Sequence, residues 1–227
     1  MKALTTLLIL SSFVLSSPLS GQVKFSLATD LSYLHNFDKQ QRFSVFGQTL
    51  QGNWHLDKKN TFYTRVNYYA KGKYNSNLSA TAKSVSTLPQ SISVSNNTEM
   101  SLKIFSVGIK RYLVGYYDKL EKFNLYGSAG FGLIFGAATN NFSVPVDTSI
   151  YIVQNNIASG SGNFKRLTFD ITGGWEIPVG YEIFLFTEAR LHIPTSDYPS
   201  NYLLKNDHAP FTGSLNLGFR ILFNNDR

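Results

Sequence analysis

The chain has 227 residues, no cysteine, 43% hydrophobic residues and a formal net charge of +7. The absence of cysteine excludes a small secreted fold held together by disulfides. The 21 Lys and Arg residues form no basic cluster interleaved with aromatic side chains, which argues against nucleic-acid binding. The 18 Phe and 13 Tyr residues are typical of a protein whose aromatic rings line membrane interfaces.

The N-terminus has the pattern of a secretory signal peptide. A positively charged start, Met1-Lys2, is followed by an apolar run ending at Leu15 and by small or turn-forming residues up to Gly21. The apolar run is shorter than the ~20 residues that a membrane-spanning helix needs. We therefore predict a signal peptide at 1–21 and one mature domain at 22–227. The alternative is a buried N-terminal helix.

Eight segments of the mature chain alternate apolar and polar side chains with a period of two, as β-strands with two different faces do. In the last segment, Phe219 and Ile221 share the apolar face and Arg220 lies on the other. The second and fourth segments change phase partway, and in the second we interpret the change as a bulge near Gly47. The predicted strands span residues 23–35, 42–56, 61–74, 100–113, 123–135, 164–177, 181–193 and 211–223.

The connections between these segments alternate in length after the second strand. Short connections at 57–60, 114–122 and 178–180 alternate with long polar ones at 75–99, 139–163 and 194–210. Outer-membrane barrels place short turns in the periplasm and long loops outside the cell. We therefore predict an all-β fold, an eight-stranded antiparallel up-and-down transmembrane β-barrel. The alternative is a soluble lipocalin-like barrel whose apolar faces point inward.

Two segments resemble a known group of proteins. The sequences FNLYGSAGFGLIFG and GSLNLGFRILF look like strands of the small eight-stranded outer-membrane β-barrel superfamily. This superfamily includes the transmembrane domain of outer-membrane protein A, the opacity-type surface proteins and similar barrels of the Bacteroidetes group. Asn216, Gly218, Ile221 and Phe223 match the signal that assembly machinery reads on a last strand in that superfamily. The tail 224–227 departs from the pattern, since many members end on the aromatic residue.

The resemblance carries architecture rather than chemistry. It implies a monomer in the outer membrane of a Gram-negative cell envelope, inserted by the barrel-assembly machinery. It also implies contact with outer-membrane lipid and lipopolysaccharide.

Six charged residues fall on the polar faces of the predicted strands. An eight-stranded barrel has an interior that side chains just fill, and buried charges are tolerated there when they are paired. We therefore predict a structural network of ion pairs in the lumen. The alternative is a narrow polar path for ions or small solutes. The six residues are Asp30, Arg65, Asp170, Glu188, Arg190 and Arg220.

Catalysis is not expected from this sequence. Glu188, His192 and Ser196 invite comparison with lipid A deacylases, in which a His, a Ser and an acid lie together near the outer rim. However, His192 shares the lumen face of Glu188, and the compact His-x-Ser-Asn spacing is missing. No nucleophile elbow, phosphate loop or two-His metal pattern is present, and Asp147 and the other loop acids are too scattered to specify calcium. We predict no catalytic residue, cofactor or metal.

The long connections at 75–99 and 139–163 are the predicted carriers of function. They are rich in Ser, Thr and Asn with scattered apolar residues, and the run 149–153 is expected to extend a hairpin beyond the membrane. Functional residues concentrate on loops held by a rigid scaffold. We predict a structural or surface-interaction role in which these segments bind an extracellular ligand or partner protein. The alternative is a flexible, antigenically variable surface.

Overall fold

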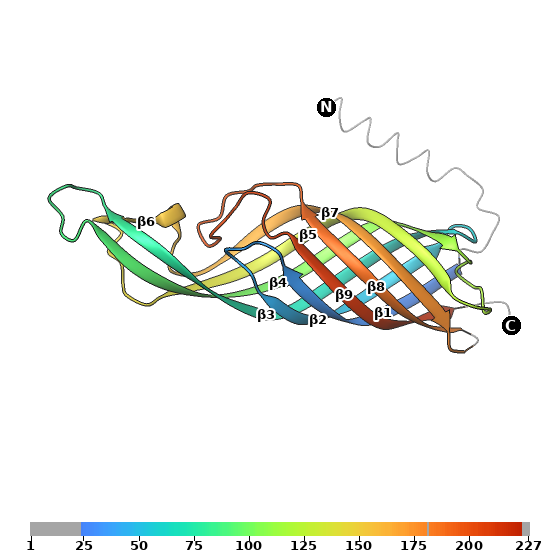
Figure 1. Cartoon of the computed structure of the whole chain (residues 1–227). Coiled ribbons are helices and arrows are strands. Elements are labelled where there is room, and N and C mark those ends of the chain that lie inside the picture. Colours follow the sequence, from blue (N-terminus) through green and yellow to red (C-terminus); the bar gives the residue numbers. More distant parts are fainter. Residues whose placement is uncertain (1–23, 181, 224–227) are drawn as a thin grey trace, which may run out of the picture.

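The computed structural model describes residues 24–180 and 182–223. The predicted signal peptide, Val23, Tyr181 and the tail 224–227 lie outside the described residues. Eight long antiparallel strands form a closed ring (Figure 1), which confirms the predicted fold class. In the described part of the chain, no helix is long and apolar enough to cross a membrane.

The strands follow one another around the ring in chain order. β1 (Lys24–Asn36) closes the ring by pairing with both β2 and β9 (Thr212–Phe223). A three-residue strand, β6 (Tyr151–Val153), pairs only with the far part of β3, and a short 3-10 helix, η1 (Gln154–Asn156), follows it. The other ring strands are β2 (Ser44–His55), β3 (Asn60–Ala82), β4 (Ser91–Val114), β5 (Asn124–Phe142), β7 (Gly160–Pro178) and β8 (Ile183–Pro194).

The two ends of the barrel differ in their connections. The short β2–β3, β4–β5 and β7–β8 connections lie at one end, which we call the turn end. The long connections lie at the other, the loop end (Figure 1). At the turn end, Asp57 accepts hydrogen bonds from the Asn60 side chain and from the backbone amides of Lys59 and Asn60. These bonds, with that from the Asn60 side chain foremost, hold the pKa of Asp57 below its usual value.

The apolar faces of the strands point away from the barrel axis. Phe46 is 72% exposed, and Leu31 and Phe131 are each 68% exposed. Phe219 on the closing strand is also exposed, whereas Arg220 beside it is buried inside. A soluble barrel would need the opposite orientation, so the lipocalin-like alternative is excluded. The exterior is suited to hydrocarbon, and the interior holds the charges.

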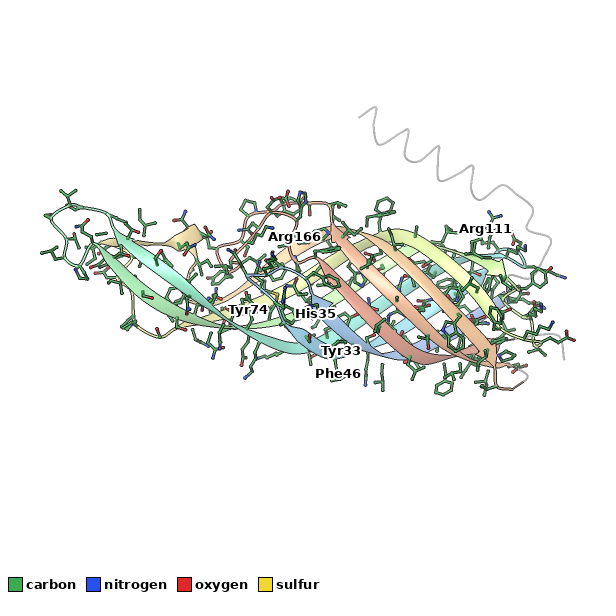
Figure 2. The ribbon with its side chains drawn as sticks, viewed as in Figure 1. Tyr33, His35, Phe46, Tyr74, Arg111 and Arg166 are labelled. Carbon is green, nitrogen blue, oxygen red and sulfur yellow. The ribbon has the colours of Figure 1, made fainter. Side chains whose placement is uncertain are left out.

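Aromatic side chains gather at both ends of the apolar exterior. Phe25 and Trp54 lie 5.3 Å apart at the turn end, and Tyr33 and Phe46 lie 5.4 Å apart toward the loop end (Figure 2). Phe25 and Phe37 are twelve residues apart, which is roughly 40 Å along a strand and about 30 Å along the barrel axis at a tilt of ~40°. That height is enough to cover the ~25 Å apolar band of an outer-membrane barrel.

The change of phase in β2 does not come from a bulge. The β1–β2 ladder runs without interruption from Lys24 opposite His55 to His35 opposite Ser44, so the predicted bulge near Gly47 is wrong. Phe43 and Val45 are buried inside the barrel with an apolar cluster at its loop end. The sequence pattern changed because the interior turns from polar to apolar along the strand.

The same explanation holds for β4. Met100, Leu102 and Ile104 are buried inside the barrel, in line with the buried Lys110. Phe105, at one of the positions between them, faces outward. The even-numbered residues of β4 therefore face inward all the way from Met100 to Lys110.

The bulge that does occur is in β3. Tyr69 pairs with Leu102 and Gly72 with Met100, so two β3 residues, Ala70 and Lys71, stand opposite one β4 residue. The extra residue changes which positions face inward: the buried positions are odd-numbered up to Tyr69, whereas beyond the bulge Gly72 and Tyr74 are buried and Lys73 is exposed.

Of the two segments predicted to be loops, 75–99 is largely strand, and 139–163 is strand at both of its ends and at β6. β3 and β4 continue as one hairpin to Ala82 and Ser91, and β5 and β7 pair as far as Asn140 opposite Gly160. Ser, Thr and Asn side chains do not prevent ladder hydrogen bonds, since those use only the backbone. The run 149–153 contributes β6, in agreement with its predicted hairpin extension.

Gly130 tests the packing of the ring. An added Cβ there would lie 2.3 Å from the Val107 carbonyl oxygen and 2.7 Å from the Tyr63 hydroxyl, inside the barrel. We expect Gly130→Val to lower the free energy of unfolding by about 1–3 kcal/mol, the usual cost of overpacking. Gly173→Val is the matched control, because nothing lies within 4 Å of a Cβ there. Urea unfolding in detergent, followed by heat-modifiable gel migration, measures both; equal midpoints would contradict the packing described.

Candidate functional site

The middle of the barrel interior contains an ion network centred on Arg190. Its guanidinium lies 2.6 Å from the Asp30 carboxylate and 2.5 Å from that of Glu188, and it also donates to the Thr49 hydroxyl. The pairs join β8 to β1 and β2 across the lumen. Each of the three charged side chains is at most 5% exposed. A buried cation held between two anions is a stable arrangement only because the surrounding hydroxyls and amides satisfy the remaining lone pairs.

Arg65 reaches the same network from the opposite side. Its guanidinium lies 3.8 Å from Glu188 and 4.8 Å from the centre of the Tyr63 ring. Glu188 also accepts a hydrogen bond of 2.9 Å from the Tyr126 hydroxyl. Glu188 therefore accepts hydrogen bonds from Arg190 and Tyr126 and forms a longer ion pair with Arg65, and these contacts tie β3, β5 and β8 together through the interior.

A second network lies nearer the turn end. Arg220 donates to both carboxylate oxygens of Glu176, at 2.7 and 3.1 Å, and to the backbone oxygen of Tyr117. Lys110 approaches the same carboxylate at 3.7 Å, and the Tyr112 hydroxyl donates to it at 3.0 Å. The contact with Tyr117 fixes the β4–β5 connection beneath the barrel.

Asp170 forms a third group. It accepts hydrogen bonds from the hydroxyls of Ser106 at 2.5 Å and Thr168 at 2.7 Å, and a carboxylate oxygen lies 3.0 Å from Nδ1 of His192. All four side chains are fully buried. The six charged residues singled out from the sequence thus divide among three groups inside the barrel.

Sequence reasoning missed Glu176 and Lys110, which are as deeply buried as the six. Glu176 has the same parity as Asp170 along β7, so strict alternation was a sufficient signal for it. Lys110 was missed because the supposed change of phase in the fourth strand obscured its inward parity.

The loop end of the interior is closed by an apolar plug. It is built around Leu34, Tyr69, Met100 and Phe164, all buried. The long connection between β8 and β9 folds over this plug rather than projecting from the barrel (Figure 1). Leu203 of this connection is fully buried in the same cluster.

Polar contacts hold the β8–β9 connection in place. Arg166 Nε donates to the Ala209 carbonyl oxygen at 2.9 Å, and the Gln41 side-chain amide donates to the Lys205 carbonyl oxygen at 2.9 Å. Asn140 donates to the Tyr202 carbonyl oxygen at 3.2 Å. The connection is therefore a fixed cover on the barrel mouth.

The residues considered for lipid hydrolysis do not form a common site. His192 contacts Asp170 inside the barrel, and Glu188 contacts Arg190. The Ser196 hydroxyl accepts a hydrogen bond from the backbone amide of Leu167 at the rim. Among the described residues, no hydrogen bond or ion pair joins these three side chains to one another, and each has a structural partner of its own.

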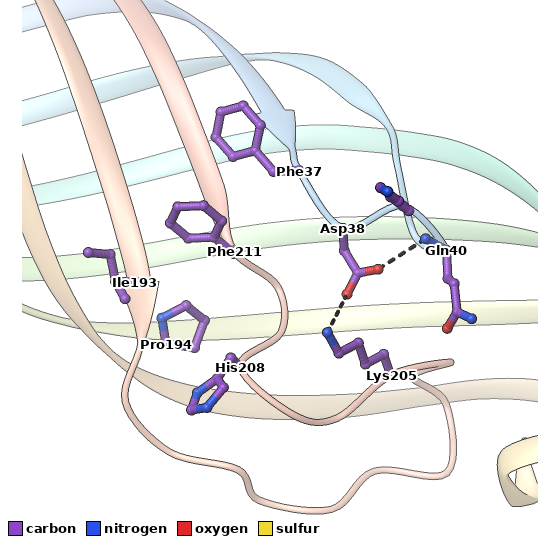
Figure 3. A pocket seen from close by; sticks show the side chains of 9 residues that line it. Phe37, Asp38, Gln40, Ile193, Pro194, Lys205, His208 and Phe211 are labelled. Carbon is purple, nitrogen blue, oxygen red and sulfur yellow. Dashed lines mark hydrogen bonds and ion pairs between the residues drawn. The ribbon is translucent and has the colours of Figure 1, made fainter.

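A surface pocket lies at the loop end between the β1–β2 and β8–β9 connections (Figure 3). Its walls include Phe37, Phe211 and Pro194, and Lys205 reaches Asp38 across it at 3.9 Å. Asp197, Asp207 and His208 lie nearby, with ligand atoms within 4.8 Å of one another. All three are exposed, and the two nitrogens of His208 face different carboxylates, at 4.0 and 3.3 Å, so their geometry is that of surface ion pairs.

Beyond the barrel, four strands continue as a projection that we call the arm, residues 70–101 and 137–164 (Figure 1). Leu78 and Ala80 of β3, Val94 of β4 and Tyr151 of β6 pack into a small core that also includes Leu204 of the β8–β9 connection. β6 pairs with the outer edge of β3. Asp147, in the connection before β6, accepts hydrogen bonds from the Ser149 side chain and amide, and these hold its pKa below the usual value.

The tip of the arm is apolar and exposed. Val85 is 94% exposed and Leu88 is 83% exposed in the turn between β3 and β4. Ile150 and Ile152 are also exposed near β6, which lies beside this turn. This is the part of the molecule farthest from the barrel (Figure 1).

The chain forms a closed ring of eight strands with an apolar exterior and a charged interior, and β1 begins and β9 ends at the turn end. This is the fold of the small outer-membrane β-barrels. Neisserial surface protein A shares this fold with a TM-score of 0.56 at 11% identity, over 88% of this chain and 97% of that protein. Ail, the attachment invasion locus protein of Yersinia pestis, gives 0.49 at 12% identity over 89% and 100%. OprG from Pseudomonas aeruginosa gives 0.48 at 9% over 89% and 96%. No family model and no curated protein sequence matches the chain.

Removing Arg190 is expected to be strongly destabilising. Arg190→Met would leave the carboxylates of Asp30 and Glu188 buried without their main partner, which costs about 3–5 kcal/mol of unfolding free energy. Arg111→Met is the control, because Arg111 is exposed at the turn end (Figure 2), and such changes stay within about 0.5 kcal/mol. Urea titration in lipid vesicles compares the two; a midpoint for Arg190→Met equal to the control would overturn the assigned role.

The closed interior predicts that the protein does not conduct ions. In a planar bilayer, with insertion verified by protease accessibility of the arm, we expect no stepwise current, because ion pairs and the apolar plug fill the lumen. Reproducible unitary conductance from the wild-type protein would contradict this prediction and restore the pore alternative.

Proposed function

We propose that this protein is a surface-binding protein of the bacterial outer membrane, in which a closed barrel anchors an arm that contacts an extracellular partner. The observation that carries the proposal is the continuity of the arm with the barrel. The β3–β4 ladder runs from Asn60 opposite Arg111 to Thr81 opposite Ser91, interrupted only by the bulge. An arm built on uninterrupted strands keeps its tip in a defined position, as a binding surface requires.

The exposed apolar tip supports binding rather than a purely structural role. Val85 and Leu88 contact no core and point into solvent, where single apolar side chains are tolerated but a group of them marks an interaction surface. Ile150 and Ile152 are also exposed, on the segment that pairs with the end of β3. A protein or another macromolecule with a complementary apolar patch fits this surface.

The outer-membrane location is part of the proposal and is supported by the outward apolar band, the two aromatic ends and the N-terminal sequence. Insertion would use the barrel-assembly machinery, for which Asn216, Gly218, Ile221 and Phe223 remain the predicted recognition signal. The inward Asn216 also serves the interior, since its side chain donates to the Glu188 carbonyl oxygen at 3.1 Å. We propose that the protein acts as a monomer and without catalysis.

Transport fits the geometry less well. A conducting barrel needs a continuous polar path, whereas the apolar plug and the β8–β9 connection cover the loop end of this interior. The filled lumen therefore favours an anchoring role for the barrel and a binding role for the arm.

The tip provides the test of binding. Cells of a non-adherent Gram-negative strain that display the protein should adhere to cultured epithelial cells or to immobilised extracellular-matrix protein. The double variant Val85→Asp, Leu88→Asp should reduce adhesion about tenfold or more, since burial of such anchors supplies over ~1 kcal/mol each. Because both side chains are exposed, folding should be unchanged.

Tyr198→Asp is the matched control. Tyr198 is 59% exposed on the β8–β9 connection, beside Asn163 at the base of the arm and not at its tip, and its substitution should leave adhesion intact. If cells with and without the displayed protein adhere equally to the epithelial cells and to the matrix protein, the proposed function is wrong.

A further inference from the structure

A row of aromatic and cationic side chains crosses four neighbouring strands on the outside of the barrel. Tyr68 of β3 pairs with Lys103 of β4, Lys103 with Phe135 of β5, and Phe135 with Lys165 of β7. All four face outward. The ammonium of Lys103 lies 5.8 Å from the Tyr68 ring centre and that of Lys165 lies 5.8 Å from the Phe135 ring centre. The sequence places these residues far apart, and only the strand register brings them into one line.

The row lies at the edge of the apolar exterior. One step toward the turn end, the outward residues in register are all apolar: Val66, Phe105, Leu133 and Leu167. One step toward the loop end, they are the small or polar Ser101, Ala137 and Asn163. Aromatic and cationic side chains at such a boundary lie at the level of lipid headgroups.

The cations of the row have no internal counter-ion. Among the ion pairs of the described residues, none includes Lys103 or Lys165. Just beyond the row, Lys71 and Lys73 share a single carboxylate, that of Glu99, at 3.2 and 2.8 Å. The local excess of positive charge is therefore directed outward from the barrel wall.

We propose that Lys103 and Lys165 form a binding site for the phosphate groups of a phosphorylated glycolipid in the outer leaflet. A lysine ammonium binds phosphate as a compact point charge with three donors. One strand separates β4 from β7, which places the two backbones roughly 10 Å apart, within the combined reach of two lysine side chains around one lipid headgroup. The apolar row beneath would contact the acyl chains of the same lipid, and Tyr68 and Phe135 would lie beside its sugar.

This inference rests on the proposed outer-membrane location but not on the arm or its partner. It identifies one face of the barrel, β3 to β7, as the face that retains the lipid. The opposite face, around β1 and β9, carries aromatic pairs such as Phe25 and Phe223 without lysines at outward positions in register.

The turn end offers a control of matched chemistry. Lys58 and Lys59 lie at the other end of the barrel, each 5.8 Å from the Tyr116 ring centre. The pair has the same charge as Lys103 and Lys165 and the same ammonium-to-ring distance, although its two lysines share one ring, and it lies at the opposite edge of the apolar band. Lys58→Gln with Lys59→Gln thus removes equal charge at the wrong level for an outer-leaflet lipid.

The experiment uses the full mature chain folded into zwitterionic vesicles that contain a phosphorylated lipid A-type glycolipid. Native mass spectrometry after detergent extraction measures the glycolipid retained per barrel. The wild type and the Lys58, Lys59 variant should retain it equally, and Lys103→Gln with Lys165→Gln should lower its apparent affinity roughly 25-fold, about fivefold for each lysine. The dephosphorylated glycolipid should be retained weakly by all three proteins, and free inorganic phosphate should compete poorly.

Three results would overturn the inference: equal retention by the two double variants, equal retention of the dephosphorylated lipid, or complete displacement by inorganic phosphate. The last result would indicate a general anion site rather than a lipid site. A protein that folds in detergent but inserts into no vesicle would instead contradict the proposed location, so the two failures are distinguishable.

Discussion

The structure depends on the closure of the β1–β9 ladder. In hydrocarbon no water is available to hydrogen-bond a free strand edge, and each unsatisfied backbone group costs several kcal/mol. Pairing from Phe25 opposite Phe223 to Asn36 opposite Thr212 removes both edges at once. Gly218 allows the strands to approach, since an added Cβ would lie 2.1 Å from the Thr29 carbonyl oxygen. Once the ring is closed, its exterior must be apolar and its polar side chains can only point inward.

The interior then has to accommodate the charges that the exterior excludes. The groups around Arg190 and Arg220 do so by pairing opposite signs across different strands. In the third group, Asp170 accepts hydrogen bonds from the Ser106 and Thr168 hydroxyls and contacts His192. Toward the loop end the interior becomes apolar, and the β8–β9 connection covers it. The interior of the barrel is therefore filled along its length. It is polar at the level where the exterior is apolar, and it is an apolar core at the loop end, where the arm begins.

The sequence predicted the elements whose two faces differ in polarity. β1, β5, β8 and β9 alternate cleanly, so their orientation followed from period two, although β5 continues to Phe142, beyond its predicted end at Phe135. β2 and β4 misled because Phe43 and Met100 are apolar and yet inside, and alternation alone cannot separate an apolar interior from a shifted strand. The true bulge at Ala70 and Lys71 carries no sequence signal of its own. The arm was predicted to be loop because its Ser, Thr and Asn residues are typical of turns, and the Lys103–Lys165 row required the register of four strands.

The β3 bulge has a consequence for how the arm can vary among related sequences. The extra residue at Ala70–Lys71 resets which positions of β3 face inward, whereas β4 keeps one inward parity from the barrel into the arm. The arm can lengthen or shorten by matched insertions in β3 and β4 without rotating a single lumen charge out of place. Natural variation in arm length should preserve the bulge and occur in even steps on each strand, since an odd step would expose Leu78 and bury its polar neighbours.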